Sequence, residues 1–166
     1  MIVVSDTSPL LSLALIGRLD LLQQLYASIV IPGAVRAEIV ASGQGGAREV
    51  AAADWITTQA VDQAVVVKLL LREVDRGEAE AIALAVQTQA EMLLLDERKA
   101  RSVAAYLDIH VAGLLDVLQA AKQYHLIAAI QPVLDDLVAR ANFRLSRKLY
   151  QRTLRAAGEL DDAHPA

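Results

Sequence analysis

The chain has 166 residues and no cysteine, which excludes disulfides, thiolate metal sites and cysteine nucleophiles. Hydrophobic residues make up 55% of the sequence and charged residues 22%, so we expect one folded domain with a real core. The net charge of −4 argues against a uniformly basic, nucleic-acid-binding surface. Because the apolar runs are too short to span a bilayer and no basic segment opens the chain, we expect a cytoplasmic protein without a membrane span.

Short apolar strands alternate with helices along the sequence. The strands are predicted at residues 2–5, 28–31, 55–58, 92–95 and 109–112. The predicted helices cover residues 10–25 with a break at Gly17, 34–41, 47–53, 61–71, 76–89, 97–107, 113–125, 128–141 and 146–157, the last with Ser146 as its N-cap. Continuous apolar strands are typical of a parallel sheet that is covered on both faces. We therefore predict a three-layer α/β/α fold with a mostly parallel sheet of about five strands, formed by residues 1–157, and a frayed polar tail at 158–166.

Two acids directly follow predicted strands. Asp6 follows the first strand and Asp96 follows the fourth. Ligands of such sheets bind in the crevice outside the carboxyl ends of the strands, so both carboxylates are expected to face that crevice. The alternative is that each one only caps the helix after it.

A third acid lies on the helix predicted at 34–41. Val35, Ile39 and Val40 are expected to face the core there, and Glu38 lies beside them. Taken alone, Glu38 could equally be a solvated charge on the helix surface.

The helix predicted at 76–89 begins with two further acids, Glu78 and Glu80. Residues two apart on a helix cannot share a face. Glu78 aligns with Ile82 and Ala85, which form the stripe that we expect to be buried. The alternative is that both acids only stabilise the helix N-terminus electrostatically.

Carboxylates that gather in one crevice repel each other unless a cation compensates their charge. Oxygen ligands of this kind suit Mg²⁺ or Mn²⁺. These ions promote phosphodiester hydrolysis because they activate water and stabilise developing negative charge. The sequence contains no nucleophile elbow and no phosphate-binding glycine loop, and its three histidines occur late in the chain, far from any serine–aspartate pattern.

Four segments, taken in order, resemble the PIN-domain family, and within it the VapC-like subgroup: residues 4–10, 30–39, 76–82 and 94–101. The resemblance extends over nearly the whole chain, including residues 142–146. It implies a Mg²⁺- or Mn²⁺-dependent ribonuclease with an acidic pocket. It also implies a homodimer and, as in many members, a toxin that a small antitoxin protein holds inactive.

The resemblance further implies four metal ligands that together form the catalytic site: Asp6, Glu38, Glu78 and Asp96. Thr7 or Ser8 matches a hydroxyl residue that supports the ligands. The third position is commonly aspartate in these toxins, whereas this chain has Glu78, with Glu80 as a rival. Glu97 is the rival of Asp96, because the strand register is uncertain by one residue.

Basic residues cluster after the fourth strand and in the last helix. The candidate RNA contacts are Arg98, Lys99, Arg101, Lys148 and Arg152. No acid interrupts residues 140–155, although a solvated helix or an acidic protein partner would explain that run equally well.

We therefore predict a metal-dependent endoribonuclease that cleaves phosphodiesters with a metal-activated water, as the toxin of a toxin–antitoxin pair. The alternative is a catalytically degenerate PIN-like module that binds a protein partner or RNA without cleaving it. A metal phosphatase on the same scaffold is a weaker option. The helices predicted at 10–25 and 61–71 could offer an apolar groove for a partner, or could be core helices.

Overall fold

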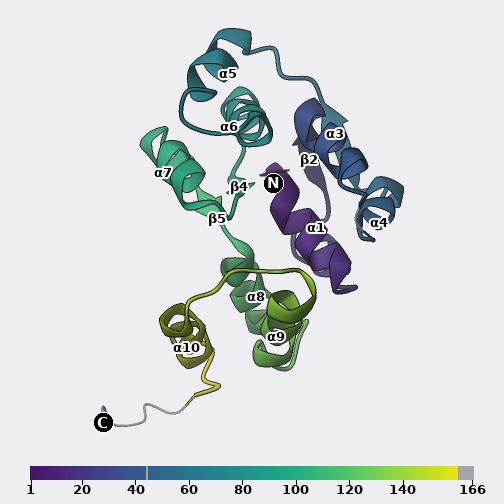
Figure 1. The fold of residues 1–166 in the computed structure, drawn as a ribbon, viewed down its shortest axis with the longest axis vertical. Helices are drawn as coiled ribbons and strands as arrows, with labels where there is room; N and C mark the ends of the chain where they lie inside the picture. Colours follow the sequence, from purple (N-terminus) through teal and green to yellow (C-terminus); the bar gives the residue numbers. More distant parts are fainter. Residues whose placement is uncertain (44, 161–166) are drawn as a thin grey trace.

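The computed structural model describes residues 1–43 and 45–160. At its centre lies a five-stranded sheet in the order β3-β2-β1-β4-β5, in which every neighbouring pair is parallel (Figure 1). The strands are β1 (Val3–Ser5), β2 (Ile29–Pro32), β3 (Ile56–Gln59), β4 (Met92–Leu94) and β5 (Val111–Ala112). The prediction of a three-layer α/β fold with a parallel sheet of about five strands is confirmed.

Helices connect the strands and cover both faces of the sheet. They are α1 (Thr7–Leu15), α2 (Asp20–Tyr26), α3 (Gly33–Ala41), α4 (Ala47–Ala52), α5 (Ala64–Leu70), α6 (Arg76–Thr88), α7 (Arg98–Tyr106), α8 (Leu114–Gln123), α9 (Gln131–Arg140) and α10 (Arg147–Ala156). Within the described residues, no helix is long and apolar enough to cross a bilayer.

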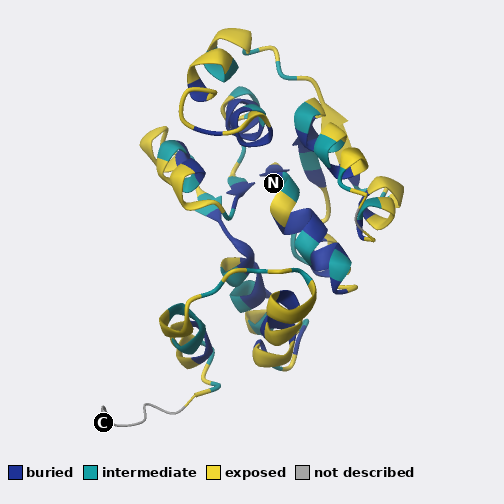
Figure 2. Cartoon of the chain, in the orientation of Figure 1, coloured by how far each residue is buried: buried dark blue, intermediate teal, exposed yellow. Residues whose placement is uncertain are grey.

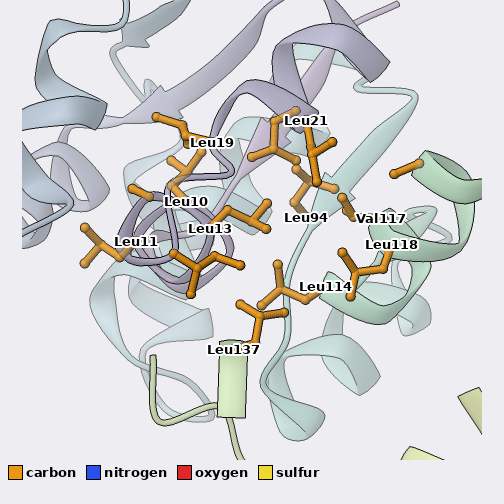
Figure 3. Packing of buried hydrophobic residues seen from close by; sticks show 14 of the residues in the cluster. Leu10, Leu11, Leu13, Leu19, Leu21, Leu94, Leu114, Val117, Leu118 and Leu137 are labelled. Carbon is orange, nitrogen blue, oxygen red and sulfur yellow. The ribbon is translucent and has the colours of Figure 1, made fainter. Parts of the chain in front are cut away.

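The core is divided by the sheet because side chains alternate between its two faces. Val3 packs into one apolar cluster with α1, α2, α8 and α9, whereas Val4 packs into a second with α5, α6 and α7. Leucines of α1, β4, α8 and α9 converge in the first cluster (Figure 3). In the second cluster α6 is the most buried helix, and it is mostly dark blue in Figure 2. The sheet is therefore rigidly held from both sides.

The strand order places a topological switch point between β1 and β4. The chain runs from β1 outward through β2 to β3, and then crosses back to β4 on the other side of β1. At the carboxyl edge, the backbone N–H of Asp6 donates to the carbonyl oxygen of Leu94 at 3.0 Å, so the pairing continues one residue beyond β1. A crevice outside the strand ends is expected at this point in parallel sheets.

Most predicted elements agree with the structure, with boundaries shifted by one to three residues. Gly17 separates α1 from α2 with a positive φ of 67°, and Ser146 caps α10 by accepting from the Leu149 N–H at 3.1 Å. The prediction that Val40 faces the core is wrong, because its side chain is 65% exposed. Val40 lies five residues after Val35, which turns it roughly 140° around the helix from that buried side chain.

The end of the described chain is fastened to the body by Glu159, which was predicted to lie in the polar tail. Its carboxylate accepts from the backbone N–H groups of Ile130 at 2.6 Å and Gln131 at 2.9 Å, and pairs with Lys122 Nζ at 2.7 Å. These donors lower the pKa of Glu159 although burial opposes them. The rest of the predicted tail, residues 161–166, lies outside the described residues.

We predict that Glu159→Gln lowers the free energy of unfolding by about 1–3 kcal/mol at neutral pH, because the ion pair and one acceptor oxygen are lost. The lowered pKa means that this stabilisation is complete above the ordinary value of 4.5 and disappears as the pH falls through the lower folded-state value. Urea unfolding at pH 7 and at acidic pH measures it. The exposed Glu49→Gln is the control, and an equal effect of both substitutions would contradict the role of Glu159.

Candidate active site at the carboxyl edge of the sheet

Asp6 stands at the centre of the carboxyl edge, directly after β1. It occupies the N-cap position of α1, but its side chain makes no capping hydrogen bond. The capping alternative that the sequence left open is therefore not the role of this side chain. Only 7% of the residue is exposed, so a carboxylate that follows the innermost strand is left buried at the end of the sheet.

Glu38 reaches the same edge from α3. Its Oε2 atom accepts from the Thr7 hydroxyl at 2.5 Å, which ties the helix after β2 to the residue after Asp6. Its carboxylate also lies directly against Gly77, where a Cβ would come within 2.5 Å of Oε1. A residue with a side chain at position 77 would occupy the space of this carboxylate. The predicted support by Thr7 thus takes the form of a hydrogen bond to the second acid.

Glu78 comes from the first turn of α6 and is 7% exposed. It forms a reciprocal capping box with Asp75, in which Glu78 N–H donates to Asp75 Oδ1 at 2.9 Å and Asp75 N–H donates to Glu78 Oε2 at 3.1 Å. This arrangement fixes the start of the helix and with it the position of the Glu78 side chain. The other carboxylate oxygen of Glu78 is not used by the box.

These acids lie close enough to act on one another electrostatically. Burial raises the pKa of Asp6 from 3.8 to about 7; the Thr7 N–H opposes this, and the charges of Glu78, Asp75 and Glu38 add to it. Burial likewise raises the pKa of Glu78; the Asp75 N–H opposes this shift, and the charges of Asp75, Glu97 and Glu38 reinforce it. We call this group the acidic cluster: Asp6, Glu38, Asp75, Glu78 and Glu97.

The two adjacent acids after β4 point to different surroundings. Asp96 Oδ1 accepts from the Leu114 N–H at 2.8 Å, at the start of α8. Glu97 caps α7 by accepting from the Ala100 N–H at 2.9 Å, and its charge acts on Glu78. Asp96 thus has a capping role, but for α8 rather than for the helix that directly follows it.

Asp96 remains electrostatically unusual. Burial raises its pKa, while the Leu114 N–H, Arg101 and the Ser8 hydroxyl lower it and Asp116 raises it further. Its Oδ2 atom is buried and has no hydrogen bond of normal geometry to the described residues. A buried carboxylate oxygen without a well-formed hydrogen bond is available to a cation or to a water. Which of Asp96 and Glu97 acts as the fourth ligand stays a prediction.

Glu80 lies on the other side of α6 from Glu78, as the spacing of the two residues requires. Its Oε2 accepts from the Ala34 N–H at 2.9 Å and its Oε1 pairs with Arg76 Nε at 3.1 Å. With Glu38 it lines a hollow of about 520 Å³ at the start of α3. Glu80 is therefore a neighbour of the acidic cluster whose charge is already partly balanced.

Within the described residues, no three histidine or acidic side chains are arranged so as to hold a metal ion between them. The chemistry of the donors nevertheless fits a hard divalent cation, because Asp6, Glu38 and Glu78 offer only oxygen atoms. The raised pKa values of Asp6 and Glu78 are also what a crowded group of acids shows when nothing balances its charge. The assignment of the ligands stays a prediction.

The predicted RNA contacts divide into two groups. Arg98, Arg101 and Arg152 line a common cavity of about 900 Å³, to which Asp96 also contributes. Lys99 instead pairs with Glu73 at 3.1 Å on the surface, and Lys148 is exposed on α10 outside the cavity.

Two residues at these sites were missed by the sequence analysis. Asp75 belongs to the acidic cluster. Its position three residues before Glu78 is the spacing of a capping box, and that spacing could have indicated it. Arg144 lines the cavity with the other arginines. It lies in a segment without regular structure, where no periodicity indicates which way a side chain faces.

Comparison with known proteins places this arrangement in a family. The family described as DUF3368: PIN domain matches this sequence over residues 2–159, which is nearly the whole chain. The chain belongs to this PIN-domain family. The predicted family is thereby confirmed, whereas its VapC-like subgroup is not. PIN domains are generally metal-dependent nucleases.

A solved structure shows the same fold. This PIN domain is similar to a PilT N-terminus domain protein, SSO1118, from Sulfolobus solfataricus P2. The TM-score is 0.53 at 17% identity, and the match covers 73% of this chain and 93% of the archaeal one. None of the curated proteins matches this chain.

We predict that Asp6→Asn stabilises this PIN domain in EDTA at pH 8, by about 2–4 kcal/mol, because the wild type must there keep a buried charge among like charges. The pKa of Asp6 is raised from 3.8 to about 7. The charge of Asp6 therefore does not destabilise the wild type below pH 3.8, destabilises it increasingly between the two values, and has its full effect above the higher one. The measurement is urea unfolding across this range. Asp136→Asn, at an exposed position of α9, is the control. Parallel stability curves for all three proteins would rule out a buried, charged Asp6.

Proposed function

We propose that this PIN domain is a Mg²⁺- or Mn²⁺-dependent endoribonuclease whose reaction takes place at the acidic cluster. The observation that carries the proposal is the burial of Asp6 among Glu38, Asp75 and Glu78 at the switch point of a parallel sheet. A protein gains nothing in stability from such crowding, because each charge destabilises the others. A bound cation would balance these charges, so the crowding is explained if the acids serve to bind one.

Asp6, Glu38 and Glu78 would hold the ion, with Asp96 as the fourth ligand and Glu97 as its rival. When bound, the ion supplies positive charge that activates a water for attack on the phosphodiester and balances the charge of the leaving oxygen. Because the pKa of Asp6 lies at about 7 without the ion, Asp6 must lose its proton for the ion to bind.

The remaining residues position these ligands. The Thr7 hydroxyl donates to Glu38 and leaves one of its carboxylate oxygens free, so that Glu38 is held toward Asp6. The capping box with Asp75 positions the Glu78 side chain, because it fixes the start of α6. The first turn of α6 also brings Gly77 against Glu38, so α3 and α6 set the spacing of the second and third acids. Ser8 supports Asp96 by lowering its pKa.

We also propose, from the resemblance to the VapC-like subgroup, that the protein is the toxin of a toxin–antitoxin pair, acts as a homodimer and is blocked by a small antitoxin protein. The predicted groove on α1 and α2 has little support, because α1 is largely buried in the core. On α5, by contrast, Val65 is 73% exposed and Leu69 62% exposed, and these residues lie one turn apart on the surface. The exposed face of α5 is therefore the better candidate for contact with a partner chain.

A second candidate function is a module that binds RNA or a protein partner without cleavage. The observation in its favour is that the described residues present no ready arrangement of three metal ligands. Such a module would form complexes at the same edge of the sheet, but would turn over no substrate with any metal.

We predict that the purified protein, freed of any partner, cleaves RNA with Mg²⁺ or Mn²⁺ and not with EDTA. Asp6→Asn is expected to lower the cleavage rate at least about a hundredfold, because an amide cannot replace a charged ligand of the ion. Mixed single-stranded and structured RNA, separated on denaturing gels, provides the measurement.

Asp136→Asn is the matched control, since it removes an exposed carboxylate on α9 and should cleave at the wild-type rate. Cleavage by Asp6→Asn at the wild-type rate, with metal still required, would disprove the assignment of the site. A folded wild type that cleaves nothing at any metal concentration, yet retains RNA or a partner in a pull-down, would favour the binding module.

A pair of glycine substitutions tests whether the contact between α3 and α6 matters for activity. Gly77→Ala is expected to displace the Glu38 carboxylate and to lower cleavage severalfold or more while the protein stays folded, since the obstructed group is the end of a flexible side chain. Gly33→Ala at the start of α3 meets nothing within 4 Å and should leave cleavage unchanged. Initial rates and thermal unfolding of both variants measure this. Equal rates for the two variants would show that the position of Glu38 does not matter.

A further inference from the structure

A cavity of about 900 Å³ lies between α7, α8 and α10. The arginines of its lining come from three separate parts of the chain. Arg98 and Arg101 belong to α7, Arg144 to the segment before α10, and Arg152 to α10 itself. Phe143 adds an aromatic ring, and Asp96 and Asp116 contribute negative charge.

The arginines of this cavity are not equivalent. The charge of Arg101 is balanced within the protein, because Arg101 pairs with Asp116 at 3.6 Å; it also donates to the Leu95 carbonyl oxygen at 3.2 Å. Arg98, Arg144 and Arg152, by contrast, have no carboxylate within 4.0 Å among residues 1–43 and 45–160. All three are exposed. Three uncompensated guanidinium groups around one hollow form a site for several negative charges.

The cavity reaches the edge of the sheet at which the acidic cluster lies. Its lining runs along β5, from His110 before the strand to Gly113 after it, and includes Asp96 after β4; Asp6 follows β1, which pairs with β4. Neighbouring strands lie about 4.8 Å apart, so β1 and β5 are separated by roughly 10 Å. Asp96 and Glu97 are consecutive, yet the first lines the cavity and the second belongs to the acidic cluster. A ligand in the cavity therefore lies next to the proposed reaction site.

We propose that this cavity binds the sugar–phosphate backbone of a single-stranded RNA segment next to the bond to be cleaved. Arg98, Arg144 and Arg152 contact successive phosphates, and the ring of Phe143 offers a surface on which a base can stack. The inference rests on the proposed function, because the acidic cluster itself repels phosphates. The arginines would hold a polyanion close to carboxylates that it would otherwise avoid.

The mixed lining favours a nucleic acid strand over an acidic protein segment. Arginine combines phosphate contact with stacking, and an aromatic ring beside it suits a ligand that alternates charge with flat apolar bases. An acidic peptide would use the charges but not the ring.

The test measures binding in EDTA, where the proposed reaction cannot proceed. The probe is a fluorescent single-stranded RNA of about 12 nucleotides, titrated at several salt concentrations. The cavity variant carries Arg144→Gln and Arg152→Gln. The matched control carries Arg147→Gln and Arg155→Gln, which remove the same charge from exposed positions of α10 that do not line the cavity. Thermal unfolding verifies that both variants fold.

We expect the cavity variant to bind the RNA about tenfold more weakly at low salt. The slope of the logarithm of its binding constant against the logarithm of the salt concentration should be less negative by about 1.4, since two phosphate contacts are lost. The control should bind nearly as the wild type does. Equal losses in both variants, no loss in either, or equally strong displacement of the RNA by polyglutamate would overturn the proposal. A wild type that shows this binding pattern but cleaves no RNA with metal would refute the nuclease alone.

Discussion

The burial of one carboxylate, Asp6, at the end of the innermost strand is the constraint around which this protein is arranged. Its charge is disfavoured twice, first by the loss of water and then by three neighbouring acids, and its pKa lies at about 7 as a result. The sheet, the pairing of β1 with β4 and the N-terminal turn of α1 all hold Asp6 at this place. The structure therefore keeps an electrostatic conflict at its switch point that only a proton or a cation can relieve.

Local capping interactions position the acids around Asp6. The capping box of Asp75 and Glu78 is common at helix starts, and here it also positions a carboxylate of the acidic cluster. Gly77 lies between these two residues and allows Glu38 to approach from α3. The same few residues thus stabilise a helix and set the geometry of the site.

The segment after β4 links the acidic cluster to the arginine-lined cavity. Asp96 turns toward α8 and the arginine-lined cavity, whereas Glu97 caps α7 and acts on the acidic cluster. Successive side chains point in opposite directions at the end of an extended strand, and this alternation separates two adjacent acids. The proposed phosphate site and the proposed metal site therefore meet at one turn of the chain.

The fold class, the order of the elements and the first acid could be predicted from the sequence. Apolar runs and helical spacing indicate elements locally, and a carboxylate directly after a parallel strand has to lie at the carboxyl edge. Spacing alone also predicts the buried position of Glu78, whereas the prediction that Val40 shares the core face of Val35 and Ile39 is wrong, because Val40 is turned away from Val35 around the helix.

Only the tertiary structure decided which groups meet. Asp75 joins the acidic cluster because α6 packs against β1, and Arg144 joins the cavity because the irregular segment before α10 lines it together with α7 and α8. No local pattern encodes a contact between residues that are far apart in the chain. The sequence by itself determined the elements and their chemical groups, whereas the packing of distant elements determined which charges lie close enough to change one another's pKa.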